Sequence, residues 1–213
     1  MNEQNNEGPL TAKERAQNAI LAYEEECIEI ITSNRAIVLH KDPAFNQYRL
    51  LFDAIDLCVV YDLDITLLRN QVKCAETKWR ANLNARLLAM TIWECVDDLP
   101  AIFGREVRGA LADLTISHNL RTELDETLRD INIFKRTHGS SLKAIRDFTA
   151  AHRDQRVDRL LAALQEVRPM DVVDLARSLR LLLQALHKTM ITVLREAKQL
   201  IPFWHATRSF KPS

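Results

Sequence analysis

An arginine, an aspartate and a histidine lie close together in the segment Leu142–Asp154, and their side chains can carry out acid–base chemistry on a phosphodiester. Arg146 is followed by Asp147, and five residues separate Arg146 from His152. A histidine with an ordinary pKa near ~6.5 can accept and donate protons at neutral pH. A permanently charged, forked arginine can bind phosphoryl oxygens. Because RNA carries its own nucleophile, its cleavage needs only these two functions, and Asp147 could orient either partner.

This arrangement resembles the motif of HEPN domains, a family named for higher eukaryote and prokaryote nucleotide binding. The family signature is an arginine, four to six further residues and a histidine, often with a polar residue directly after the arginine; Arg146, Asp147 and His152 fit it. The likeness extends over about residues 83–200. It implies a metal-independent endoribonuclease in which the ribose 2′-hydroxyl attacks the adjacent phosphate. It also implies a role as a toxin or phage-defence effector, with a protein antitoxin or regulator as a further partner.

The resemblance further implies a symmetric homodimer in which the motifs of both protomers meet. Six residues along a regular helix place Arg146 and His152 about 120° apart, so the helix is bent, the long arginine curls round it, or the partner protomer completes the site. The last of these is what the resemblance implies. We therefore expect the dimer to form through the helix that carries them. The window from Lys135 to Arg159 has seven basic and three acidic residues, a net charge of +4. RNA is the expected partner, no cofactor or metal is expected, and the candidate RNA-binding residues are Lys143, Arg153 and Arg156.

Other interpretations of these residues stay open. Arg146, Asp147 and Arg153 could form a solvated charged face, and His152 could be structural. The alternative function is a non-catalytic HEPN-like helical module that binds a protein or a nucleic acid. A third possibility is an antitoxin or adaptor whose acidic N-terminal helix docks on a basic partner, because residues 1–34 contain seven acidic and two basic residues.

The composition excludes several classes of protein. The 213 residues include four glycines and six prolines, too few turn residues for a many-stranded sandwich or barrel. No glycine-rich phosphate-binding motif occurs. The four cysteines form no C-x-x-C pair, so a zinc site is poorly supported, and each has an apolar helical context typical of a small buried side chain. With neither a signal peptide nor a long apolar run, we expect a cytoplasmic protein without membrane contact.

Apolar residues recur at helical spacing along most of the chain and predict an all-α antiparallel bundle over residues 10–201, after a flexible segment 1–9. Additional N-terminal helices are expected over 11–61, the first beginning at a capping box formed by Thr11 and Glu14. Asp62 and Asp64 predict a break, followed by a long helix through residue 96. Trp79 and Trp93 are expected in the core.

The C-terminal half is expected to contain four more helices. Pro100 and Gly104 are expected to interrupt the helical pattern. A short helix is expected after them, over 105–114. The next should begin near residues 117–119 and end at a turn over 138–141, where glycine can close one helix and serine can cap another. The motif would then lie at the start of a helix from residue 142. Asp171 is a plausible cap for a final helix that reaches residue 200.

The last residues, 202–213, form a separate tail in which aromatic residues alternate with basic ones. It contains Phe203, Trp204, Arg208, Phe210 and Lys211. Such a composition could stack on bases, pack back over the bundle or pack into a partner.

Overall fold

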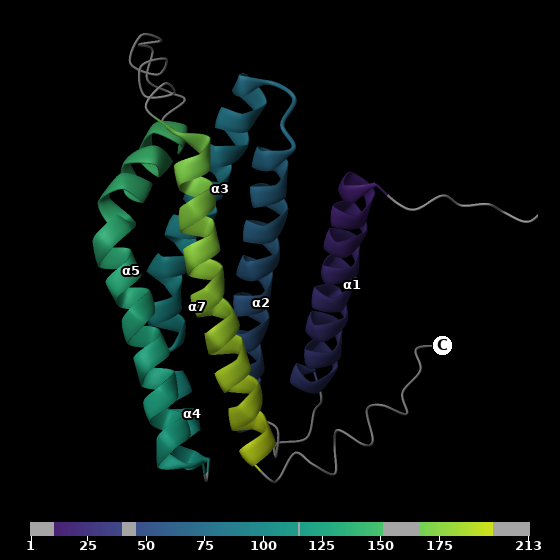
Figure 1. Ribbon diagram of the computed structural model, residues 1–213. Helices are drawn as coiled ribbons and strands as arrows, with labels where there is room; N and C mark the ends of the chain where they lie inside the picture. Colours follow the sequence, from purple (N-terminus) through teal and green to yellow (C-terminus); the bar gives the residue numbers. More distant parts are fainter. Residues whose placement is uncertain (1–10, 40–45, 115, 151–166, 198–213) are drawn as a thin grey trace, which may run out of the picture.

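Every element that the computed structural model describes is a helix, as the apolar periodicity predicts. The structure describes residues 11–39, 46–114, 116–150 and 167–197, and no strand occurs in these ranges. The helices are α1 (Ala12–Val38), α2 (Asn46–Lys73), α3 (Lys78–Ile102), α4 (Arg105–Asp113), α5 (His118–Ala150) and α7 (Pro169–Glu196) (Figure 1).

The helices α2, α3, α5 and α7 form an antiparallel four-helix bundle. Each packs against its two neighbours in the bundle, and α3 also contacts α7. Successive helices of the bundle run in opposite directions, and α4 lies at one end (Figure 1). The apolar stripes of the four helices face one another, since no single helix can bury its own stripe. The largest fully buried side chains come from all four: Leu51, Phe52, Ile55, Ile65, Leu88, Ile92, Leu99, Ile131, Leu142, Leu179 and Leu183.

Helix α1 lies outside this bundle and packs chiefly along α2 (Figure 1). Its N-terminal half is almost entirely exposed, and the side chains of Leu21 and Ile28 are half exposed. The C-terminal half of α1 makes both apolar and polar contacts, because Cys27 is buried in the core and Ile30, Ile31 and Val38 pack against it. The Asn34 amide donates a hydrogen bond to Asp56 over 2.7 Å, and Arg35 forms ion pairs with Asp53 and Asp56 at 3.0 and 3.2 Å. Apolar packing and polar contacts therefore both hold the C-terminal half of α1 in place.

Side-chain caps begin several helices where the sequence predicts them. The Thr11 amide donates to the Glu14 carboxylate over 2.7 Å, and the Glu14 amide donates to the Thr11 hydroxyl over 3.2 Å, which confirms the capping box. Ser117 caps α5 by accepting a hydrogen bond from the Leu120 amide. The short helix α4 is also confirmed.

The predicted break at Asp62 and Asp64 is wrong, because α2 runs through both residues to Lys73. The Asp62 side chain is buried between helices and has polar partners there, so it does not interrupt the helix. The break lies instead over residues 74–77, and the Thr77 hydroxyl caps α3 by accepting from the Arg80 amide.

The predicted turn at residues 138–141 is also wrong, because α5 is continuous from His118 to Ala150. Gly139 is buried within this helix, where an added Cβ would lie 3.1 Å from Cζ3 of the Trp93 ring. The Ser141 hydroxyl donates to the His138 carbonyl within the same helix. Gly139 therefore allows α5 to approach α3 closely and ends no helix.

The expected start of the final helix needs correction. Pro169 opens α7 at its first turn, with Arg168 as the N-cap, so Asp171 lies within the first turn and does not cap the helix. Pro100 lies inside α3, two residues before the helix ends. The expected end of the final helix near residue 200 lies outside the described residues.

Two expectations about burial fail as well. The Trp79 side chain is 60% exposed, whereas Trp93 packs on the core. Cys27, Cys58 and Cys95 are buried as expected, but Cys74 is exposed beyond the end of α2.

The environments of two helical glycines predict opposite effects on stability. We expect Gly139→Leu to lower the free energy of unfolding by about 1–3 kcal/mol, because the new side chain would overpack against Trp93. In contrast, Gly109 in α4 has no atom within 4 Å of an added Cβ. We expect Gly109→Ala to raise the same free energy by about 0.5–1 kcal/mol through helix propensity. Urea denaturation followed by circular dichroism measures both, and stabilisation by Gly139→Leu would contradict the close packing of α3 and α5.

Candidate functional site

The sequence-predicted site begins in the last turns of α5, where Arg146 is held between an acid and an aromatic ring. Its Nε and Nη2 atoms donate to Oδ1 of Asp147 over 3.0 and 2.7 Å. The guanidinium carbon lies 5.7 Å from the centroid of the Trp93 ring. Because the bonds to Asp147 use Nε and Nη2, the Nη1 edge of the guanidinium takes part in neither bond. The side chain of Arg146 is 35% exposed, so a ligand at the surface can reach it.

A second cation lies on the same indole. The Lys135 ammonium is 5.8 Å from the centroid of the Trp93 ring and 2.8 Å from Oδ1 of Asp97. The hydrogen bond from Lys135 lowers the pKa of Asp97, and the charges of Arg146 and Lys143 lower it further. Three cations of α5 thus act on Asp97, and two of them, Lys135 and Arg146, lie over the Trp93 ring. Aromatic rings flanked by cations can bind the bases and phosphates of single-stranded nucleic acid.

The structure describes only part of the sequence-predicted site. Arg146, Asp147 and Lys143 lie on α5, close to its end, and not at the start of a helix as the sequence suggested. His152, Arg153 and Arg156 lie outside the described residues. The predicted 120° separation of Arg146 and His152 therefore stays a prediction.

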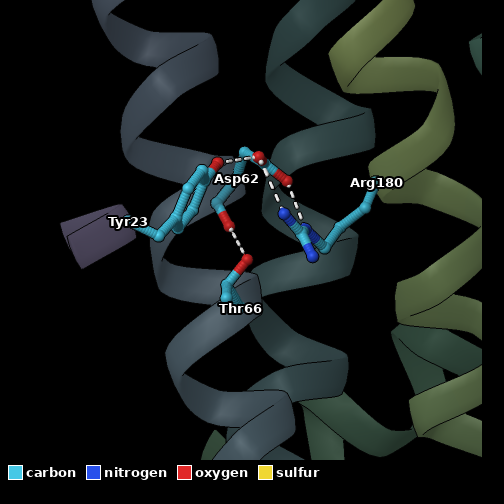
Figure 2. A network of polar contacts seen from close by, with 4 residues as sticks. All are labelled: Tyr23, Asp62, Thr66 and Arg180. Carbon is cyan, nitrogen blue, oxygen red and sulfur yellow. Dashed lines mark hydrogen bonds and ion pairs between the residues drawn. The ribbon is translucent and has the colours of Figure 1, made fainter. Parts of the chain in front are cut away.

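A buried polar network that local sequence patterns did not predict lies between α1, α2 and α7. The two oxygens of Asp62 accept hydrogen bonds from Nε and Nη2 of Arg180 over 2.6 and 3.3 Å, and the Tyr23 hydroxyl donates to the same carboxylate (Figure 2). The backbone carbonyl of Asp62 accepts from Thr66. The Arg180 guanidinium also lies 5.4 Å from the centroid of the Tyr23 ring. Tyr23, Asp62 and Arg180 come from three different helices, so the network joins α1 to the bundle.

The electrostatics of this network favour one charge state. Burial, together with the hydrogen bond to Asp62, raises the pKa of Tyr23, which keeps its hydroxyl protonated. Burial works to lower the pKa of Arg180, but the hydrogen bond and charge of Asp62 outweigh burial and raise it. The network is therefore a neutral tyrosine with an ion pair, an arrangement suited to holding helices together.

A pocket of about 380 Å³ lies beside the network, between α1, α2 and α7. Burial raises the pKa of the Cys58 thiol to about 12 and also raises that of Cys27, so neither thiol is an activated nucleophile at neutral pH. The residues that line this α1–α7 pocket are Tyr23, Glu26, Cys27, Ile30, Cys58, Val59, Asp62, Leu183, Gln184, His187, Lys188, Ile191, Thr192 and Arg195.

The imidazole of His187 in this pocket should make stability depend on pH. Burial lowers its pKa, although the charges of Asp62 and Glu26 oppose the shift. Below the ordinary pKa of about 6.5 the unfolded chain binds a proton that the folded chain does not, so stability is lost as the pH falls. We expect His187→Gln to lose less stability than the wild type between about pH 7 and about pH 5. Urea denaturation at each pH measures this difference, and equal losses in both proteins would refute the effect.

Neither a metal-binding cluster nor a membrane-spanning helix is found in the described part of the chain. No three histidine, cysteine or acidic side chains are grouped there in a way that could hold a metal ion. Glu25 and Glu26 are exposed and Glu24 is half-buried. None of the described helices is both long enough and apolar enough to cross a membrane.

No family model matches the chain, and neither the curated proteins nor the solved structures contain a match.

Proposed function

We propose that the protein is a metal-independent endoribonuclease of HEPN type, in which Arg146 binds the scissile phosphate and His152 transfers protons. The observation that supports this proposal is the fixed orientation of the Arg146 guanidinium. Its guanidinium is oriented by two bonds to Asp147 and by the face of Trp93. Neither bond uses its Nη1 edge, which in this proposal binds a phosphoryl oxygen. An arginine held in this way loses little conformational freedom when it binds a phosphate.

The proposed reaction follows from the chemistry of RNA. A base removes the proton of the ribose 2′-hydroxyl while its oxygen forms a bond to the adjacent phosphorus. The bond from phosphorus to the 5′-oxygen of the next nucleotide breaks, and an acid protonates that oxygen. The products are a 2′,3′-cyclic phosphate and a 5′-hydroxyl. His152 carries the proton transfers, Arg146 stabilises the charge on the phosphoryl oxygens, and Asp147 orients Arg146.

A homodimer completes the proposed site. A straight helix separates Arg146 from His152 by about 120°, so a second copy of the chain would supply the missing half. Lys143, Arg153 and Arg156 are the proposed contacts to the RNA backbone. The same proposal includes a cytoplasmic role as a toxin or phage-defence effector, held in check by a protein antitoxin or regulator.

A cleavage assay in EDTA tests the activity directly. We expect the full chain to cleave single-stranded RNA with the chelator present and to leave cyclic phosphate ends. An RNA with a 2′-deoxy nucleotide at the cleaved position should stay intact there, because the nucleophile is missing. Loss of cleavage in EDTA, with rescue by a divalent cation, would overturn the mechanism.

A specific observation favours a second candidate, a non-catalytic module that binds a partner protein. Helix α1 exposes Leu21 and Ile28 on the outside of the bundle, together with the acidic side chains of Glu25 and Glu29. A basic partner with an apolar strip would fit this surface. This candidate predicts no RNA cleavage at all and a partner affinity that Leu21→Asp abolishes.

A further inference from the structure

The α1–α7 pocket has a mainly apolar interior, into which Asp62 and His187 also contribute polar groups, and a charged rim. Ile30 comes from α1, Val59 from α2, and Leu183 and Ile191 from α7. The pocket exists because α1 packs chiefly on α2. The outer lining residues, which include Glu26 and Lys188, are exposed, so the pocket reaches the surface.

The two walls of the pocket carry opposite charges. On the α1 side, Glu26 lines the pocket, and Glu25 and Glu29 are exposed nearby on the same helix. On the α7 side, Lys188 and Arg195 line it. An occupant with an apolar part and positive charges would therefore place its charges toward α1 and away from α7.

The chain itself supplies such an occupant next to the pocket. Helix α7 ends at Glu196, one residue after Arg195, which lines the pocket. The following segment, 198–213, contains three basic residues and no acidic one, so its charge is opposite to that of the α1 wall. Its aromatic residues are Phe203, Trp204 and Phe210. Aromatic side chains gain more from burial in an apolar pocket than other residues do.

The segment after α7 is long enough to reach along the whole pocket. Along α7 the lining runs from Leu183 to Arg195, which is about 18 Å at ~1.5 Å per residue. Phe203 and Trp204 follow Ala197 by six and seven residues, which is about 20–23 Å of extended chain at ~3.3 Å per residue. A segment that turns back at the end of α7 can therefore place both rings anywhere along the pocket. The short connection also gives the segment a high effective concentration there.

We propose that the C-terminal segment 198–213 folds back and docks Phe203 and Trp204 in the α1–α7 pocket, with its basic side chains facing the glutamates of α1. The segment would thereby clamp α1 to α7. This proposal is independent of the RNA-cleaving activity and goes beyond it.

Methyl NMR of the full chain tests the docking. The δ1 methyl groups of Ile30 and Ile191 line the pocket, whereas Ile133 lies half exposed on α5 and serves as the control. Aromatic rings shift the resonances of methyl groups that they contact. We expect the double variant Phe203→Ala/Trp204→Ala to move the Ile30 and Ile191 resonances and to leave Ile133 in place. In the wild type, nuclear Overhauser effects should connect the Trp204 ring to Ile191.

Several results would decide against this docking. Unchanged Ile30 and Ile191 resonances in the double variant would overturn it. Shifts that disappear on dilution of the wild type would assign the pocket to the tail of a second copy and would also overturn it. Charge reversal provides an independent check, because Glu26→Lys should weaken the same Overhauser effects. If Glu26→Lys left them at full strength, the assigned role of the α1 wall would be wrong.

Discussion

The Asp62→Ala variant is expected to have a free energy of unfolding about 3–5 kcal/mol lower than that of the wild type. The substitution removes the acceptor of both Arg180 and Tyr23. The Arg180 side chain is only 14% exposed, so its charge would be left buried without a partner. Removing one member of a buried ion pair costs more than the pair contributes, because the desolvation of the remaining charge is no longer offset. Urea denaturation followed by circular dichroism at neutral pH measures the effect.

Two further variants make this expectation specific. Asp64→Ala removes an exposed acidic side chain two residues along the same helix, and we expect it to change the free energy of unfolding by no more than about 0.5 kcal/mol. The double variant Asp62→Leu/Arg180→Met replaces both charges with apolar groups of similar size. It should recover most of the lost stability. If the double variant were as unstable as Asp62→Ala, the loss would come from packing and not from the unpaired charge.

The second large effect concerns catalysis. We expect His152→Ala to slow RNA cleavage by about 10²–10⁴-fold while RNA binding largely persists, because the substitution removes proton transfer. Arg146→Lys should also cleave poorly, since an ammonium keeps the charge but cannot make the planar two-pronged contact with phosphate. Single-turnover cleavage assays and direct binding measurements on the same RNA separate the two effects.

The matched control for these variants is Arg136→Lys, an exposed arginine on the same helix, which should cleave at the wild-type rate. Full activity of His152→Ala would sink the proposed mechanism and favour the non-catalytic module. A single-chain mass in light scattering at high micromolar concentration would remove the dimer from the proposal.

Much of the fold could be predicted because the signals for a helix lie in residues that are close together in the sequence. The capping box at Thr11 and Glu14 and the cap at Ser117 depend on neighbouring residues alone, and both occur in the structure. The apolar stripe of α7 predicts a helix because every third or fourth residue is apolar, and Leu179, Leu186 and Met190 are indeed buried.

The incorrect predictions concern residues whose structural role depends on a partner far away in the sequence. Asp62 resembles a helix breaker locally, but it occupies a position in an apolar stripe with Ile55, Val59 and Ile65, so it is buried. A charge at such a position signals a buried partner, which here is Arg180, 118 residues further along the chain. Gly139 likewise resembles a turn residue, although its role depends on the ring of Trp93 on another helix. Neither partner can be identified from local sequence.

The candidate site was predicted only in part. The types of residue in the motif around Arg146 indicate acid–base chemistry on a phosphodiester. The structure places Asp147 and Lys143 on the same stretch of helix. The role of Trp93 could not be predicted, because the indole comes from α3 and its contact with Arg146 depends on how closely α3 and α5 approach.

The peripheral position of α1 has a consequence for hydrogen exchange. We expect the core that α2, α3, α5 and α7 enclose to persist if α1 leaves, because α1 packs chiefly on the outer face of α2. Helix α1 should then act as a separate cooperative unit that opens in a sub-global transition and leaves the bundle folded. Its amide protons would exchange with solvent deuterium long before those of α2, at a rate governed by the rupture of the contacts between Tyr23, Asp62 and Arg180.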